Sequence, residues 1–108
     1  MSTKRESPFA CMMDGLTADQ KTRTFALLDE LIAKKQEVRE FPDGFAFRYS
    51  MDSDTFLKAA EFITYEHRCC PFFDFNLIVE RKGGDMWLKL TGRQGVKEFI
   101  REEFRLDD

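Results

Sequence analysis

The hydrophobic residues of this chain follow two periods, one typical of helices and one typical of strands. Apolar side chains that recur every three or four residues predict helices over about 18–35, 54–69 and 94–105. Thr17 is followed three residues later by Gln20, and this capping-box pattern predicts that the first helix begins directly after Thr17. We therefore expect three helices that are spread along the whole chain.

Four shorter segments alternate between apolar and polar residues, as strands with one buried face do. The segments 38–41 and 45–49 flank a Pro-Asp-Gly sequence, in which proline pre-sets a turn dihedral and glycine permits a positive φ. The segments 75–79 and 86–90 flank a second turn sequence, Lys-Gly-Gly-Asp. Two β-hairpins are therefore predicted.

The predicted elements follow one another in the order α-ββ-α-ββ-α. This order is typical of an α+β domain in which a four-stranded antiparallel sheet carries helices on one face. The segment 45–50 and the Glu-Phe-Ile sequence at 61–63 parallel the segment 86–91 and the Glu-Phe-Ile sequence at 98–100. We therefore predict a single domain over 1–108, with a ββα pseudo-repeat as a hypothesis.

Composition and charge disfavour several classes of function. The 17 basic and 20 acidic residues are interspersed and give a net charge of -3, so the concentrated basic surface of a nucleic-acid-binding protein is not expected. The chain has no run of about 18 apolar residues, and its first residues are polar, so we predict neither a membrane span nor a signal peptide. A cytoplasmic protein is the resulting expectation.

Aromatic content adds an expectation about assembly. The chain has 12 phenylalanines among 108 residues, more than one small core readily holds, because each buried aromatic side chain removes roughly 150–250 Å² from water. Some of them are therefore expected to line a pocket or an interface, which favours a homodimer formed through an aromatic surface.

The cysteines do not form a disulfide framework. Their number is odd, three, and two of them are adjacent: Cys11, Cys69 and Cys70. In a reducing cytosol such thiols are more often buried, reactive or metal-binding, and a bridge between two adjacent cysteines departs from ordinary disulfide geometry. Residues 1–16 form an irregular leader that contains Cys11, and we expect this leader to dock over Cys69 and Cys70.

The second predicted helix, capped by Asp52 or Ser53, carries an apolar stripe to its carboxyl end. The stripe consists of Phe56, Ala59, Ala60, Ile63, His67 and Cys70. Glu66 lies on the same edge, whereas Cys69 is expected about 100° away, near Phe62. A regular helix would thus separate the two thiols. Pro71 changes this expectation, because a residue that precedes proline is disfavoured in helical geometry, so Cys70 can leave the helix.

Two thiols, the single histidine and a carboxylate stand close together at this helix end. Thiolates and imidazole are suitable ligands for zinc, copper(I) and mercury(II). A helix carboxyl terminus disfavours bare thiolates, and a bound cation would offset this, so metal binding is favoured over an activated nucleophile. The candidate metal ligands are Cys69, Cys70, Cys11, His67 and Glu66. The protein would use them to buffer, deliver or sense the ion.

Two other interpretations remain open. The protein could perform thiol redox chemistry, in which Cys11 forms a disulfide with Cys69 or Cys70. It could instead be a non-catalytic domain whose cysteines are buried and whose aromatic surface binds a partner or a second copy. No Ser-His-Asp set is recognisable and there is one histidine, so we assign no catalytic residue. The sequence does not determine whether the protein is an enzyme.

Glu66, Cys69, Cys70 and Pro71, followed by Phe72, form an E-x-x-C-C-P-F motif. Over roughly residues 45–100 the chain resembles a group of small, largely uncharacterised bacterial proteins that carry this motif. Members of this group sometimes occur near, or fused to, mercury-regulator-type and other metal-resistance proteins. The resemblance therefore implies heavy-metal or metalloid handling.

Overall fold

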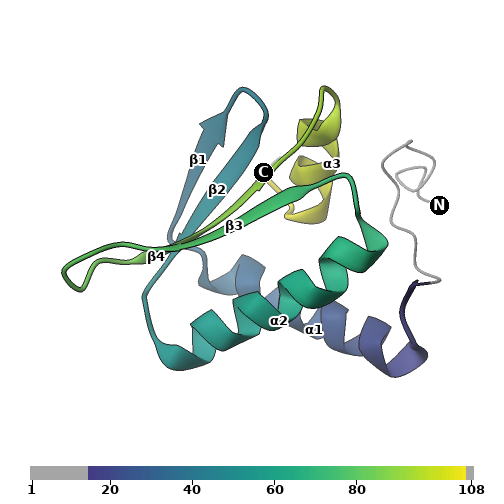
Figure 1. The fold of residues 1–108 in the computed structure, drawn as a ribbon, viewed down its shortest axis with the longest axis horizontal. Helices are drawn as coiled ribbons and strands as arrows, with labels where there is room; N and C mark the ends of the chain where they lie inside the picture. The colour runs from purple at the N-terminus through teal and green to yellow at the C-terminus, as the bar shows by residue number, and fades with distance from the viewer. Residues whose placement is uncertain (1–14, 107–108) are drawn as a thin grey trace.

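A computed structural model describes residues 15–106 and has the element order α-ββ-α-ββ-α, as the sequence predicts (Figure 1). The elements are α1 (Ala18–Lys34), β1 (Glu37–Phe41), β2 (Gly44–Tyr49), α2 (Ser53–Cys69), β3 (Asp74–Val79), β4 (Met86–Thr91) and α3 (Val96–Glu103). The predicted α+β class is thus confirmed.

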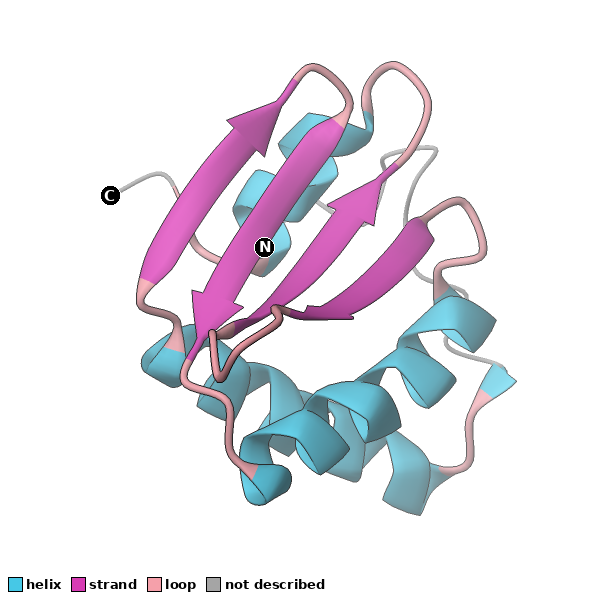
Figure 2. Ribbon diagram, turned by 60° about the vertical axis from the view of Figure 1, so that its left-hand side comes forward, coloured by secondary structure: helices cyan, strands magenta, loops and turns pink. Residues whose placement is uncertain are grey.

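The two hairpins join into one antiparallel sheet with the order β1-β2-β4-β3. Strands β2 and β4 are therefore central, and they pair with Phe47 opposite Leu88. Figure 2 shows the helices of the described residues on one side of this sheet. Helices α2 and α3 contact the strands, and α1 packs against α2. The pseudo-repeat stays a prediction.

The core lies between the sheet and the helices and is rich in phenylalanine. The ring of Phe47 in β2 stacks on that of Phe104 at a centroid distance of 4.4 Å, and Phe62 of α2 meets Phe104 edge-on at 6.2 Å. Phe104 directly follows α3, so these contacts join three elements that are distant in sequence. Many of the phenylalanines are thereby used in the core, and a homodimer surface remains a prediction.

The side chains at the starts of α1 and α2 form the caps that the sequence predicts. The Thr17 hydroxyl accepts a hydrogen bond from the Gln20 amide at 3.1 Å, and the Gln20 side chain accepts one from the Thr17 amide at 2.9 Å. These two bonds complete the capping box. At the start of α2, Asp52 is the capping residue and accepts a hydrogen bond from the Thr55 amide at 2.8 Å.

Two predictions about the helices are wrong in detail. Ala59 and Cys70 of the predicted stripe are fully buried, whereas His67 is exposed. The most deeply buried edge of α2 runs through Ala59, Phe62, Glu66 and Cys69. The reason is that α2 is covered both by α1 and by the sheet, so residues between those two neighbours are buried most deeply.

Helix α3 is shorter than the predicted helix over about 94–105. It begins at Val96 and ends at Glu103. Its capping residue is Gly95 with φ 98° and ψ -18°, a left-handed conformation that cannot continue into a helix. The two residues before Val96 therefore belong to the turn and not to the helix.

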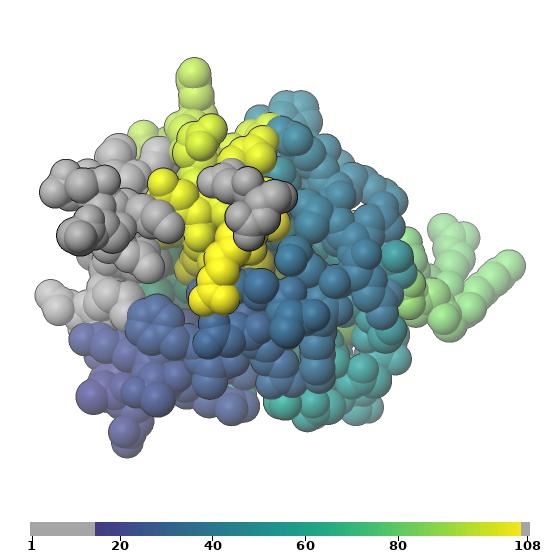
Figure 3. Space-filling model, turned by 180° about the vertical axis from the view of Figure 1, so that it is seen from behind, coloured from purple at the N-terminus to yellow at the C-terminus, as the bar shows by residue number. Residues whose placement is uncertain are grey.

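Figure 3 shows α1 and α3 next to each other on the side of the molecule opposite the view of Figure 1. Arg105, beyond the end of α3, donates a 2.9 Å hydrogen bond to Asp29 of α1. A pocket of about 180 Å³ lies between the two helices and is lined in part by Phe25, Leu28 and Phe99. Within residues 15–106, no helix has the combination of length and apolar character needed to cross a membrane.

Candidate metal centre

The site lies where α2 ends, and Pro71 determines its geometry. Cys69 is the last residue of α2, and Cys70 leaves the helix with φ -128° and ψ 68°. The Cys70 amide still donates a 2.6 Å hydrogen bond to the Glu66 carbonyl, so Cys70 stays close to the last helical turn. This is the departure from helical geometry that a residue before proline is expected to show.

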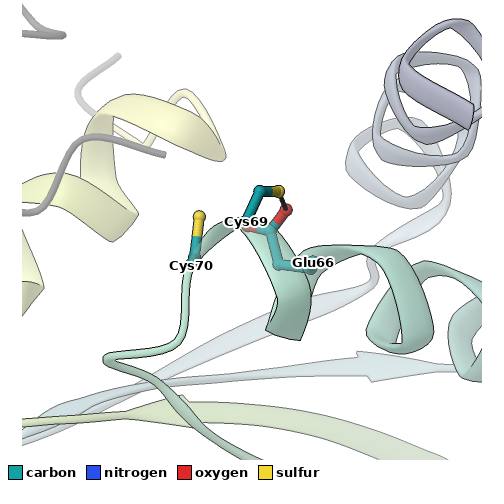
Figure 4. A group of neighbouring side chains, drawn as sticks. All are labelled: Glu66, Cys69 and Cys70. Carbon is teal, nitrogen blue, oxygen red and sulfur yellow. Dashed lines mark hydrogen bonds between the residues drawn. The ribbon is translucent and has the colours of Figure 1, made fainter. Parts of the chain in front are cut away.

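The last turn of α2 brings together Glu66, Cys69 and Cys70. One carboxylate oxygen and the two sulfur atoms lie within 4.8 Å of one another. The side chains are 1%, 1% and 0% exposed, respectively. In Figure 4 the side chains of Glu66 and Cys69 point toward each other, while the sulfur of Cys70 stands beyond the end of the helix. These three residues form the candidate metal centre.

The separation of the donor atoms is close to what a metal ion requires. Ligands of a tetrahedral zinc ion with metal–sulfur bonds of about 2.3 Å lie about 3.8 Å apart. The donor atoms of the centre lie within 4.8 Å of one another, so a contraction of about 1 Å would complete the geometry.

Two glutamates of α2 have different surroundings. Glu61 accepts hydrogen bonds from Arg23 at 2.8 and 3.0 Å, and the nearby guanidinium lowers the pKa of Glu61 below its usual value. Glu66 is buried and accepts the Cys69 thiol hydrogen at an S···O distance of 3.9 Å. Glu61 therefore belongs to a surface ion pair, and Glu66 belongs to the candidate centre.

The position of the centre favours positive charge. The carboxyl end of α2 carries the negative end of the helix dipole, and Glu66 adds a carboxylate there. A buried carboxylate next to thiols is costly unless it is protonated, hydrogen-bonded or neutralised by a cation. A bound cation would therefore stabilise this arrangement.

One predicted ligand lies elsewhere, and another falls outside the described residues. His67 is exposed and is not a member of the three-residue group. Its position one residue after Glu66 turns it away from the buried edge of the helix. Cys11 lies outside the described residues, so its predicted role as a ligand is not tested.

The oxidation states of the two adjacent cysteines differ. Cys69 is a buried thiol, whereas Cys70 is in a disulfide bond. A disulfide sulfur is a poor metal ligand, because thiolates are the sulfur groups that bind metals strongly. The structure thus holds the residues of the centre in place, and Cys70 must be reduced before it can bind an ion.

Two phenylalanines follow the centre directly along the chain. The Phe73 amide donates to the Cys70 carbonyl at 3.3 Å, so the backbone turns directly after the cysteines. Phe72 and Phe73 both contact Phe99 in α3, at centroid distances of 5.5 and 5.7 Å. These contacts fix the segment after Cys70 against α3.

Sequence reasoning missed one contact, which fixes the end of the leader at this site. The Arg68 guanidinium donates a 2.7 Å hydrogen bond to the Gly15 carbonyl. A Cβ at Gly15 would lie 3.3 Å from the Arg68 carbonyl oxygen, so the two backbones are nearly in contact. Leu16 is 7% exposed and belongs to the core. A glycine close before a helix cap was the available signal, but it does not identify Arg68 as its neighbour.

Comparison of the chain with protein-family models, with curated proteins and with solved structures finds no match. The expectation drawn from the E-x-x-C-C-P-F motif therefore stays a prediction.

Proposed function

We propose that the reduced protein binds a soft metal ion through Cys69, Cys70 and Glu66. The observation that carries this proposal is the buried group itself, in which two sulfur atoms and a carboxylate oxygen lie within 4.8 Å of one another. Buried ionisable groups are rarely gathered in this way unless they are paired or bind an ion.

The donor atoms indicate the class of ion. Two thiolates and one carboxylate favour a thiophilic cation over magnesium or calcium, which prefer oxygen ligands alone. Zinc, copper(I) and mercury(II) all fit this description, and the three residues do not select among them. With a divalent ion, two thiolates and one carboxylate leave a net charge of -1, which protonation of Glu66 would neutralise.

Cys11 is the candidate for a further ligand. Gly15, held against Arg68, lies four residues after Cys11 along the chain. Four extended residues span at most about 14 Å, which is enough to return a side chain to the end of α2. We propose that Cys11 supplies a third sulfur ligand. We do not propose His67 as a ligand, because it is exposed.

A small protein with one buried soft-metal site is suited to buffering, delivering or sensing the ion. The resemblance to motif-bearing proteins near metal-resistance proteins favours the same class of function. The proposal does not require an enzymatic reaction.

Anaerobic titration of the fully reduced protein with Zn(II), Cu(I) and Hg(II), in competition with chelators of known affinity, tests this function. We expect one ion per chain and an affinity at least about 1000-fold weaker in the Cys69→Ser, Cys70→Ser double variant. His67→Asn is the matched control, and we expect it to leave the affinity within about threefold, because His67 is exposed. Unchanged affinity in the double variant would refute the proposal.

Thiol redox chemistry is the second candidate, and the disulfide bond at Cys70 favours it. In that case a cysteine would be oxidised by a substrate and restored by a second thiol. Turnover of peroxide or of a disulfide substrate with a reducing partner, measured with no metal present, would distinguish this activity from metal binding.

A further inference from the structure

Strand β3 forms one edge of the sheet, and no strand within residues 15–106 pairs with its outer side. Its sequence, Asp-Phe-Asn-Leu-Ile-Val, is rich in residues that favour strands and has one charged residue, at its start. Ile78 and Val79 are 44% and 48% exposed. We propose that this edge pairs with the β3 edge of a second copy of the chain, so that the two sheets join across a twofold axis. This inference does not depend on metal binding.

The backbone of β3 presents hydrogen-bonding groups to the outer side of the sheet. The Glu80 amide donates a 2.9 Å hydrogen bond to the Asp85 carbonyl, which continues the pairing of β3 with β4. In an antiparallel pair, residues whose amide and carbonyl groups face the neighbouring strand alternate with residues whose groups face away. Phe75, Leu77 and Val79 therefore direct these groups to the outer side of β3. They supply the donors and acceptors that an added strand needs.

Strand β1, at the other edge of the sheet, carries charges that disfavour such pairing. Three of its five residues are charged, namely Glu37, Arg39 and Glu40. Glu37 pairs with Arg48 of β2 at 2.9 Å, and Glu40 pairs with Arg101 of α3 at 3.2 Å. Charged side chains along an edge are a common protection against added strands. Pairing is therefore expected between two β3 edges, which closes a dimer, and not between β3 and β1, which would continue into a filament.

Charge and sheet geometry exclude some registers of the two β3 strands. Opposite side chains in an antiparallel pair lie on the same face of the sheet, so the twofold axis must pass beside a residue and not between two residues. An axis at Leu77 places Asp74 opposite Glu80 of the second copy, and these like charges repel. An axis at Asn76 places Asp74 opposite Ile78, which removes a carboxylate from water without a partner.

An axis at Ile78 brings complementary residues together. Asn76 then lies opposite Glu80 of the second copy, and its amide group can donate a hydrogen bond to that carboxylate. Leu77 lies opposite Val79 on the face that carries the helices, and both residues have their backbone groups directed outward, so each such pair exchanges both of its backbone hydrogen bonds. The exposed Ile78 side chain meets its own copy at the axis.

The turn after β3 adds a charge attraction in this register. Arg81 and Lys82 are exposed, and Figure 1 shows that the turn between β3 and β4 projects from the body of the molecule. With the axis at Ile78, Asp74 of each chain lies beside Lys82 of the other chain. The acidic start of β3 thus meets the basic turn that follows β3, and the twofold axis repeats this contact. This self-complementarity favours a second copy over an unrelated strand.

Sedimentation equilibrium of the full chain tests the dimer. Excess reductant and a chelator are present, so that neither a disulfide nor a metal ion can link two chains. We expect a reversible monomer–dimer equilibrium with a Kd of about 10 μM, because one short strand edge buries less surface than a standard interface. A chain that stays monomeric up to about 1 mM would overturn the second copy as the occupant of this edge.

Two lysine variants test whether β3 is the interface. Ile78→Lys places two lysines against each other at the axis, and we expect it to weaken the dimer at least about 100-fold. Val38→Lys is the matched control, because Val38 is 41% exposed and lies in β1 at the other edge. We expect this control to leave the Kd within about twofold. Equal unfolding midpoints would show that both variants fold. An unchanged Kd in Ile78→Lys, or an equal loss in both variants, would overturn β3 as the interface.

A charge exchange and amide hydrogen exchange test the register. Lys82→Asp is expected to weaken the dimer about tenfold, and the double variant Asp74→Lys, Lys82→Asp is expected to restore it. In the unchanged protein, the amides of Leu77 and Val79 are expected to exchange more slowly as the protein concentration rises, because they donate to the second copy. Absence of rescue in the double variant would overturn the register at Ile78. Exchange at both amides that is independent of concentration would overturn the strand pairing itself.

Discussion

The Cys69 sulfur lies 3.9 Å from Oε1 of Glu66, one helical turn earlier, and both side chains are only 1% exposed. This contact makes Glu66 part of the centre and distinguishes it from the other acids of α2. We expect Glu66→Gln to weaken Zn(II) binding by the reduced protein about tenfold, or ~1.4 kcal/mol, because an amide oxygen is a weaker ligand than a carboxylate.

Glu61→Gln is the matched control for this prediction. Glu61 is on the same helix but pairs with Arg23. We therefore expect the Glu61→Gln variant to bind Zn(II) with the affinity of the unchanged protein. Competition titration measures both variants. Equal affinities for the two would show that Glu66 does not bind the ion.

The sequence predicted the element order and the capping residues because these depend on neighbouring residues. Thr17 and Gln20 interact across one helical turn, and Pro71 acts on the residue directly before it. Pro71 was also the reason that the sequence could place both thiols at one site.

Features that depend on contacts between distant segments could not be predicted in the same way. The pairing of β2 with β4 joins residues about forty positions apart, and the sequence does not specify it. The buried edge of α2 depends on the position of α1, so the sequence favoured His67 where the structure buries Cys69. The contact between Arg68 and Gly15 is also long-range and has no local signature.

Gly44 is required where β2 begins. A Cβ at this position would lie 1.9 Å from the Leu90 carbonyl oxygen, and the strand pairing prevents the backbone from moving away. We expect Gly44→Ala to lower the free energy of unfolding by about 3 kcal/mol. Gly83→Ala is the control. Gly83 has φ 72°, and a Cβ added there would meet no atom within 4 Å, so its cost is limited to about 1 kcal/mol of backbone strain. Urea unfolding measures both, and equal losses would contradict this explanation.

Tyr49 connects β2 to α1 through a buried hydrogen bond. Its hydroxyl donates to the Leu31 carbonyl at 2.9 Å, and burial raises the pKa of the phenol above its usual value. The neutral phenol is thus favoured in the folded state, so this contribution to stability is present below about pH 10 and is lost as the pH rises further. We expect Tyr49→Phe to cost about 1 kcal/mol at pH 7 and to reduce the decline in stability above pH 10. A variant with unchanged stability at pH 7 would show that the hydrogen bond contributes nothing.

The ion pairs of Glu30 contribute to stability at neutral pH, and this contribution is lost in acid. Hydrogen bonds from Lys34 and Lys58 lower the pKa of Glu30 to about 2. The carboxylate therefore stabilises the fold above its unfolded pKa near 4.5, and this contribution is lost as the pH falls from there toward 2. Because the pair is partly exposed, Glu30→Gln is expected to cost at most about 1 kcal/mol at pH 7. Its unfolding free energy should approach that of the unchanged protein between pH 4 and pH 2, and parallel curves over that range would contradict the assignment.

X-ray absorption spectroscopy of the reduced, Zn(II)-loaded protein tests the metal centre most directly, because it identifies the atoms bound to the ion. We expect two or three sulfur atoms at about 2.3 Å and at least one oxygen at about 2.0–2.2 Å. We also expect the sulfur contribution to fall in Cys69→Ser and in Cys70→Ser. A shell made of oxygen and nitrogen alone, or a sulfur contribution that both variants leave unchanged, would show that these two cysteines do not bind the ion.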